Sequence, residues 1–303
     1  MLARRDLREQ IRGRARAALV VLCATVAPLG CGGDPVEVSP APAPAPTRTA
    51  PEAPLAGRSA QARRVTITVT ESADGRFRYQ APRSVPAGLV EIRLRNEGAV
   101  PHKAQLWRIE GNHTVQEAQR TRRPLPDWLR TAGGVALTEP GKTGTTVQKL
   151  APGRYYVAGS GNERGVVAQL RATGKPTTGE LPRAPARLDA YDFAFRSSGL
   201  RAGRQAIDFR NTGAEPHHAY FAPMRPGATL ADTLRFFAGE AQVGPPPVDV
   251  DGTRETVVIE GRQRQITELD LPAGRYALLC FVRNRAGGPQ HTELGMYQEL
   301  TIR

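Results

Sequence analysis

The stretch IRLRNEGAVPH at residues 92–102 occurs again as IDFRNTGAEPH at residues 207–217. Both stretches carry the pattern Asn-x-Gly-Ala-x-Pro-His, and a constant offset of 115 residues separates their matched positions. Before the Asn, apolar and polar side chains alternate, which is typical of a β-strand with one buried face. Chance does not place such a pattern twice in one chain, so the sequence predicts two copies of one β-rich unit.

The two copies also share a helix start. Thr114 and Thr229 lie at the same offset, and each is followed three residues later by an acidic residue, Glu117 or Asp232. A Thr and an acid at this spacing predict a capping box, in which each side chain satisfies a backbone N–H group at the start of a helix. We therefore expect one short helix in each copy.

Period-two alternation predicts strands elsewhere in both copies, at residues 65–69, 90–94, 207–209, 269–271 and 300–302. Later in the copies, Arg154 matches Arg275 at an offset of 121 residues, and Gly165 matches Gly295 at an offset of 130. The second copy therefore holds nine extra residues between these two positions.

Copies of about 110 residues, with Pro-Ala-Gly turns before successive strands, are typical of a Greek-key β-sandwich. We expect an all-β protein of two tandem sandwiches, each with one short helix. Their expected bounds are residues 63–173 and 186–303, joined by a Pro- and Gly-rich linker at residues 174–185.

Residues 1–31 have the features of an export signal. An Arg-rich start precedes an apolar run at residues 17–29, which is too short to span a membrane. The junction PLGC, ending at Cys31, resembles the lipobox of bacterial lipoproteins and implies lipidation of that cysteine. Residues 32–62 are rich in Pro and Ala, so we expect a disordered tether. These features predict an exported protein, lipid-anchored to a bacterial membrane and facing the periplasm or the cell exterior.

The composition excludes several classes of protein. With 40% hydrophobic and 23% charged residues, the chain fits folded domains rather than a coiled coil or a disordered protein. Its net charge is +13, but the Arg residues alternate along the predicted strands, and aromatic residues make up only 6%. We therefore expect no nucleic-acid partner, and membrane contact through the lipid anchor alone.

Only one of the three cysteines, Cys280, lies in the globular part of the chain. An unpaired thiol in an exported protein is open to oxidation, and a bound metal is one way to protect it. In the second copy, His217, His291 and Met296 accompany it. Two imidazoles, one thiolate and one thioether match a trigonal copper site with a weak axial Met. For Cys280 taken alone, the competing interpretation is a small buried apolar side chain.

These residues stand in the order found in the cupredoxins, the plastocyanin-like blue copper family. The stretch NTGAEPH resembles the loop that delivers the family's first His ligand, YALLC resembles the strand that ends at its Cys ligand, and HTELGM resembles its His-x-x-x-Gly-Met motif. The resemblance implies one copper per chain, bound by His217, Cys280, His291 and Met296. It further implies a type 1 copper protein that exchanges single electrons with a redox partner protein.

Two features depart from the family pattern. The loop between Cys280 and His291, residues 281–290, is longer than in small blue copper proteins. In addition, His218 occupies the position where the family usually has Asn. His218 is therefore either an alternative ligand to His217 or an outer partner of the site.

The first copy lacks most of this set. It keeps His102 but has Gly159 and Val166 at the positions of Cys280 and Met296. A single imidazole does not hold a metal, so we expect a degenerate copy with a structural or docking role.

Enzymes built from stacked cupredoxin domains carry a second copper held by extra histidines, one usually next to the Cys ligand. Here Leu279 and Phe281 flank Cys280, so we expect electron transfer without enzymatic activity. Two alternatives remain open. The same site could serve copper storage or delivery, or the chain could be a metal-free cell-surface interaction module with a cupredoxin-like fold.

Overall fold

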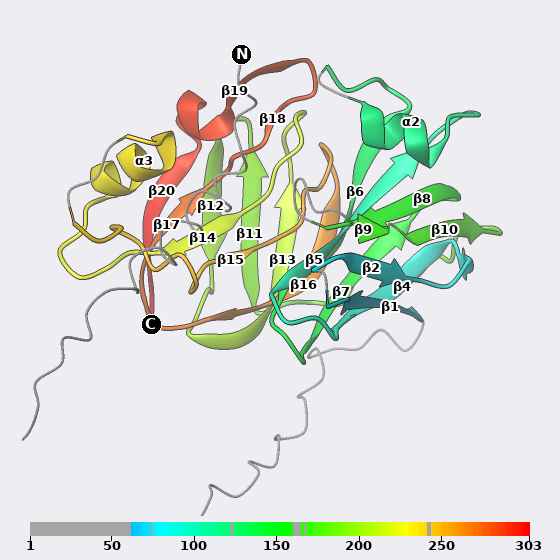
Figure 1. Ribbon diagram of the computed structural model, residues 1–303, viewed down its shortest axis with the longest axis horizontal. Helices are drawn as coiled ribbons and strands as arrows, with labels where there is room; N and C mark the ends of the chain where they lie inside the picture. Colours follow the sequence, from blue (N-terminus) through cyan, green and yellow to red (C-terminus); the bar gives the residue numbers. More distant parts are fainter. Residues whose placement is uncertain (1–61, 74, 122–123, 160–164, 167, 241–243) are drawn as a thin grey trace, which may run out of the picture. The chain divides into compact units, whose positions relative to one another are not determined.

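The structure is a computed structural model of the 303-residue chain, and it describes residues 62–73, 75–121, 124–159, 165–166, 168–240 and 244–303 (Figure 1). The predicted signal peptide, Cys31 and nearly all of the predicted tether lie outside the described residues. The described residues belong to one compact unit. None of the helices in these ranges is long and apolar enough to cross a membrane.

Strands dominate both halves of the described chain, so the all-β prediction is confirmed. The first half contains β1 (Arg63–Glu71), β2 (Phe77–Gln80), β3 (Ser84–Pro86), β4 (Gly88–Asn96), β5 (His102–Ile109), α2 (Val115–Arg120), β6 (Leu129–Thr138), β7 (Thr143–Leu150), β8 (Gly153–Ala158), β9 (Gly165–Val166) and β10 (Ala168–Thr173). The second half contains β11 (Ala186–Tyr191), β12 (Ala194–Ser198), β13 (Gly203–Asn211), β14 (Tyr220–Pro223), α3 (Leu230–Ala238), β15 (Arg254–Glu255), β16 (Arg264–Leu271), β17 (Gly274–Leu279), β18 (Arg283–Asn284), β19 (Gly287–Gln290), the 3₁₀ helix η1 (His291–Leu294) and β20 (Tyr297–Ile302).

Each half is a sandwich with a core between two layers. One layer is shared: a nine-stranded sheet in the order β12-β11-β13-β16-β7-β4-β1-β2-β9. The first half covers its part with the sheet β3-β10-β8-β5-β6, and the second half uses β15-β14-β17-β20. The first core joins side chains such as Ile67 and Leu106, and the second joins Phe209 and Leu278.

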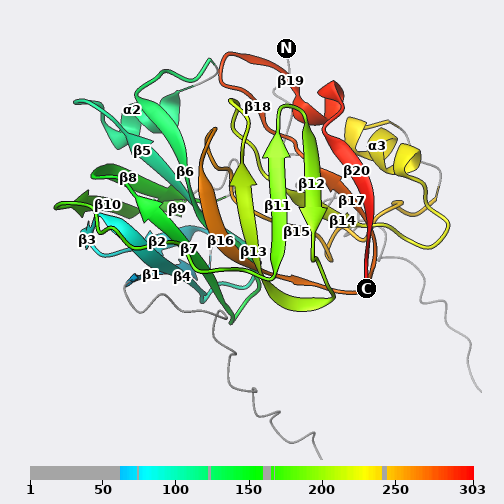
Figure 2. The same ribbon diagram turned by 180° about the vertical axis from the view of Figure 1, so that it is seen from behind.

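The sequence did not predict that one sheet would run through both halves. Figure 2 shows β16 lying between β13 and β7, and β7 pairs with β16 in antiparallel register from Thr146–Thr267 to Gln148–Gln265. The Thr146 and Thr267 hydroxyls lie 3.1 Å apart, within hydrogen-bond distance, where the two halves meet. The exact bounds of the two expected domains therefore remain a prediction.

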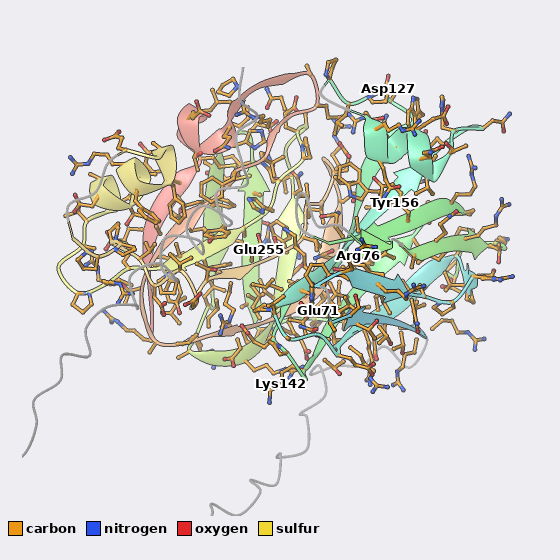
Figure 3. The ribbon with its side chains drawn as sticks, in the orientation of Figure 1. Glu71, Arg76, Asp127, Lys142, Tyr156 and Glu255 are labelled. Carbon is orange, nitrogen blue, oxygen red and sulfur yellow. The ribbon has the colours of Figure 1, made fainter. Side chains whose placement is uncertain are left out.

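Further contacts connect the halves away from the sheet. Lys103 Nζ on β5 forms an ion pair with Glu255 Oε1 on β15 at 3.3 Å, and both side chains are largely buried. Glu255 is labelled in Figure 3. The amide of Gln105 exchanges two hydrogen bonds with the backbone of Val258, one donated at 3.0 Å and one accepted at 2.7 Å.

The repeated Asn-x-Gly-Ala-x-Pro-His motif forms the same loop in both halves. Asn211 Nδ2 donates to the carbonyl oxygens of Glu215 and Ile259, and its Oδ1 accepts the N–H of Gly213 at 3.0 Å. Asn96 makes the matching set of bonds in the first half, including the bond from the Gly98 N–H. A buried Asn side chain can satisfy several backbone groups at once, so it fixes the loop that leads to the His.

The helix starts occur where the sequence predicts them. Thr114 and Glu117 form a capping box before α2, and Thr229 and Asp232 form one before α3. The prediction of one short α-helix per copy agrees with the described residues.

Candidate metal centre

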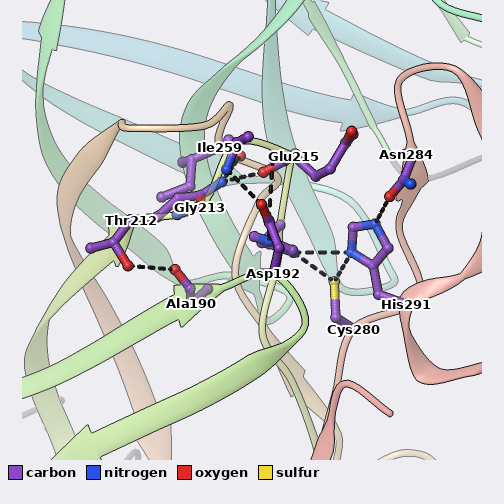
Figure 4. A network of polar contacts seen from close by, with 12 residues as sticks. Ala190, Asp192, Thr212, Gly213, Glu215, Ile259, Cys280, Asn284 and His291 are labelled. Atoms are coloured by element: carbon purple, nitrogen blue, oxygen red, sulfur yellow. Dashed lines mark hydrogen bonds and ion pairs between the residues drawn. The ribbon is translucent and has the colours of Figure 1, made fainter. Parts of the chain in front are cut away.

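Three side chains from separate elements converge in the second half. His217 lies in the loop between β13 and β14, Cys280 directly follows β17, and His291 begins η1. Their ligand atoms all lie within 4.8 Å of one another. Figure 4 shows the Cys280 sulfur beside the His291 ring. Among the described residues, no other group of three or more His, Cys, Asp or Glu side chains is placed to hold a metal.

The donor spacing suits a single ion. His217 Nδ1 lies 3.0 Å from His291 Nδ1, and Cys280 Sγ lies 3.8 Å and 3.4 Å from these two nitrogens. A trigonal metal with bonds of about 2.0 Å to nitrogen and about 2.3 Å to sulfur separates its donors by about 3.5–3.8 Å. The three donors therefore need only small shifts to coordinate one metal.

This centre resembles that of the cupredoxins.

Hydrogen bonds on the outer side of the cupredoxin-like centre determine which ring nitrogens face inward. His217 Nε2 lies 2.7 Å from Asp192 Oδ1, and His291 Nε2 lies 2.9 Å from Asn284 Oδ1. These oxygens accept hydrogen bonds, so each Nε2 carries the hydrogen and each neutral ring turns a bare Nδ1 inward. Two nitrogen lone pairs then face each other at 3.0 Å beside a sulfur atom. A cation bound between the three atoms would relieve this repulsion.

Burial controls protonation in the centre. Cys280, His217 and His291 are fully buried. Burial raises the pKa of the Cys280 thiol to about 12, although backbone N–H groups of His218 and Val282 favour the thiolate. Burial also lowers the pKa of His217, and the Asp192 carboxylate opposes that effect. The imidazole of His217 is therefore neutral near pH 7, which is the form that binds metals.

Asp192 is the ionised partner of this pair. Partial burial acts to raise its pKa, but hydrogen bonds from the Ala214 N–H, the His217 ring and the Glu215 N–H outweigh it and hold the pKa below its ordinary value. The carboxylate therefore accepts the hydrogen of His217 Nε2.

His218 points away from the three donors. Its Nε2 accepts the backbone N–H of Phe281 at 3.0 Å, and its Nδ1 lies 3.8 Å from Glu255 Oε2. The structure thus brings His217 into the cluster and places His218 behind it, against the residue that follows Cys280.

Met296 is fully buried and belongs to the same apolar core as Cys280. Its carbonyl oxygen accepts the Cys280 N–H at 3.3 Å, and its N–H donates to the carbonyl of His291 at 2.8 Å. These bonds hold the Met backbone beside two of the donors. Coordination by the thioether itself stays a prediction.

The long loop between Cys280 and His291 folds into the hairpin β18–β19 and supplies Asn284 to the His291 ring. Its next residue, Arg285, contacts the first half. The Arg285 guanidinium donates to the carbonyls of Pro126 and Leu129, and it forms an ion pair with Glu260 at 3.1 Å. The long loop of the second copy therefore contacts the first copy through Arg285.

Sequence reasoning missed Asp192 and Asn284 as outer partners of the two rings. Neither residue lies in a motif with a fixed spacing from the ligands. The strand pairing does reveal an equivalent of Asp192 in the first half: Glu71, the last residue of β1, is also an acid.

In the first half, His102 is fully buried like its counterpart His217. Its ring packs edge-on against Phe77 at a centroid distance of 4.3 Å and lies 6.4 Å from Tyr79. Gly159 stands where the second half has Cys280, while residues 160–164 lie outside the described part. The two halves thus surround the same imidazole position with different chemistry.

No protein-family model and no curated protein matches this chain. Among solved structures, it is similar to auracyanin from the photosynthetic bacterium Roseiflexus castenholzii, at 14% identity and a TM-score of 0.25, over 39% of this chain and 94% of that one. It is also similar to a multicopper oxidase, at 14% identity and a TM-score of 0.23, over 80% of this chain and 89% of that one. The copper nitrite reductase from Nitrosomonas europaea matches at 14% identity and a TM-score of 0.22, over 80% of this chain and 94% of that one.

Proposed function

We propose that this protein is a type 1 copper protein that transfers single electrons. One copper per chain is held by His217, Cys280 and His291, with Met296 as a weak axial ligand. The observation that carries the proposal is the meeting of two bare imidazole nitrogens and one sulfur within 4.8 Å, in a fully buried site.

The donor chemistry favours copper over zinc. A thiolate and a thioether are soft ligands that suit Cu(I), and imidazole suits both copper oxidation states. Structural zinc is almost always bound by four strong ligands in a tetrahedron, and this cluster has three such side chains. When bound, copper supplies a one-electron couple between Cu(I) and Cu(II).

The chain's own contribution is rigidity. Asp192 and Asn284 fix the two imidazoles from outside, and backbone N–H groups of His218 and Val282 point at the sulfur. Ligands held in this way keep their positions when the charge of the metal changes. Rapid electron exchange requires that the ligands move little when the copper changes oxidation state.

The surroundings support electron transfer over the other candidate functions. Burial of all three donors favours retention of the metal, whereas delivery to a partner requires an accessible ligand. The remaining histidines serve elsewhere: His102 packs on Phe77, His113 stacks on Trp128, and His218 binds the Phe281 N–H. These placements give no support for a second copper centre, so we propose no enzymatic role.

Export and lipid anchoring through Cys31 remain part of the proposal, as does a redox partner protein. They rest on the sequence of residues 1–62 and on the chemistry of the centre. An exported electron carrier held at a membrane surface would meet its partners by diffusion on its tether.

The test compares matched His variants in the two copies. Addition of Cu(II) to the full chain should produce a strong visible thiolate-to-copper absorption at one equivalent. His217→Asn should abolish this absorption because it removes a ligand, and Cys280→Ser should abolish it because it removes the sulfur. His102→Asn, at the matching position of the first copy, should leave it intact. A colourless wild-type protein that takes up no copper would refute the proposal.

A further inference from the structure

The two imidazoles of the centre differ in the charge of their outer partners. His217 Nε2–H donates to the carboxylate of Asp192 at 2.7 Å, whereas His291 Nε2–H donates to the neutral amide of Asn284 at 2.9 Å. A carboxylate that accepts this hydrogen makes the opposite ring nitrogen a stronger donor, and a neutral amide does so less. The cluster is therefore electronically asymmetric.

Asp192 is itself fixed in place. Its Oδ2 accepts the N–H of Ala214 at 2.8 Å, and its Oδ1 accepts the N–H of Glu215 at 3.3 Å. Gly213 makes this approach possible, since a Cβ added there would lie only 2.3 Å from Asp192 Oδ1. The carboxylate therefore braces the loop leading to His217 and the His217 ring at once.

The first half provides an internal comparison. Strand pairing sets Val69 opposite Asn96 and Ala190 opposite Asn211, so the residue two positions after each, Glu71 or Asp192, is structurally equivalent. Glu71 (labelled in Figure 3) accepts the N–H of Ala99 at 2.9 Å, which matches the bond between Asp192 and Ala214.

The loop-bracing contact is thus common to both halves. In the second half the same acid also accepts a hydrogen bond from the His217 ring, with 2.7 Å between Asp192 Oδ1 and His217 Nε2. An acid that only stabilises the loop, as Glu71 does through the Ala99 N–H, does not need to contact a histidine ring. The added contact therefore belongs to the metal centre.

We propose that Asp192 is a positioning residue of the centre, which holds His217 with Nδ1 inward and stabilises Cu(II) over Cu(I) in the bound metal. The effect on copper rests on the proposed function, whereas the orientation of the ring does not. Loss of such an outer carboxylate typically lowers metal affinity by about 10- to 100-fold. A tenfold weakening of Cu(II) binding relative to Cu(I) corresponds to a rise of about 59 mV in the one-electron reduction potential.

The experiment compares three variants of the full chain by redox titration of the visible absorption. Asp192→Asn should raise the reduction potential, and Asn284→Asp, which gives the second ring a charged partner, should lower it. Glu71→Gln, which changes only the loop-bracing acid of the first half, should leave the potential at the wild-type value. Equal potentials in Asp192→Asn, Asn284→Asp and Glu71→Gln would overturn the proposal.

A second measurement separates this proposal from the proposed function. Nitrogen-15 NMR of the metal-free wild-type chain should show His217 protonated at Nε2, with Nδ1 bare. A ring protonated at Nδ1 would overturn the positioning role whether or not copper binds. If the wild-type chain bound no copper but showed the Nε2–H form, the proposed function would fail while the positioning of His217 by Asp192 stood.

Discussion

At the scale of single residues, the centre depends on which atoms carry hydrogen. Asp192 and Asn284 take up the Nε2 hydrogens of the two imidazoles, so the inward nitrogens are already in the form that binds a metal. Cys280 differs, because burial raises its pKa to about 12 and keeps the sulfur protonated without a metal. Metal binding must therefore release one proton, and Cys280 is its source.

His218 provides the clearest test of ligand identity. We expect His218→Ala to retain one copper per chain, with an affinity lowered by at most about 10- to 100-fold, because it removes an outer partner. We expect His217→Ala to lose copper, because it removes a donor. Copper titration of both variants measures the difference. A His218→Ala protein without copper and a His217→Ala protein with it would reverse the assignment of the two residues.

The sequence was enough to propose the metal-binding side chains. It was not enough to predict Asp192 and Asn284, the loop residues that accept hydrogen bonds from the two imidazoles. His217, Cys280 and His291 could be proposed as ligands because a metal needs particular donor types and because the two copies could be aligned within one sequence. The structure brings these three side chains together. Asp192 and Asn284 act through hydrogen bonds from loops whose spacing to the ligands is not fixed. The choice between His217 and His218 also needed geometry, since both imidazoles offer the same atoms.

At the scale of elements, β13 leads to the loop that holds His217 and is anchored by a buried charge. Asp208 on β13 accepts hydrogen bonds from Arg210 Nε and Arg264 Nη2, both at 2.8 Å. Burial acts to raise the pKa of Asp208, but the two guanidinium groups outweigh it and hold the pKa below the ordinary value of 3.8. The carboxylate therefore stabilises the folded state whenever it is ionised.

Asp208→Asn should lower the free energy of unfolding near pH 7 by about 1.5–3 kcal/mol, the usual contribution of hydrogen bonds to a charged group. Because the folded-state pKa is lowered, this stabilisation is present above the ordinary pKa of 3.8 and is lost as the pH falls through the folded value. Urea unfolding of wild type and variant should therefore give curves that converge below about pH 4.

Asp251→Asn is the matched control, because Asp251 is an exposed turn residue. It should change the free energy of unfolding little at any pH. A stability difference between wild type and Asp208→Asn that stayed constant down to acidic pH would contradict the account of β13.

Local signals predicted the helices and many strands, but not how the strands pair. The spacing of Thr229 and Asp232 specifies a capping box because both groups lie in one helical turn. The alternation of Leu269, Asp270 and Leu271 indicates a strand with one buried and one exposed face. It carries no information about which strand pairs with it. The pairing of β16 with β7 depends on chain segments more than one hundred residues apart.

At the scale of the whole molecule, the two copies contribute strands to one sheet, but the candidate metal centre lies in the second copy. The first half has Gly159 at the position equivalent to Cys280. It contacts the second half through Pro126 and Leu129, whose carbonyl oxygens accept hydrogen bonds from Arg285. Arg285 directly follows Asn284, the outer partner of His291. The first half thus supports the loop that completes the centre.

The structural or docking role expected for a degenerate first copy stays a prediction. The contact of Arg285 with Pro126 and Leu129 of the first half favours the structural alternative. It could not be foreseen from the sequence, because the loop at residues 281–290 shows only a Gly-Gly-Pro turn signal.

The central claim is that the second of two β-rich copies binds one copper, held by one sulfur and two imidazoles. X-ray absorption spectroscopy at the copper edge, on the full chain loaded with copper and with its metal content measured, tests it most directly. The account predicts one copper per chain, with one sulfur and two histidine nitrogens in its inner shell. A copper bound by nitrogen and oxygen alone, or two coppers per chain, would contradict it.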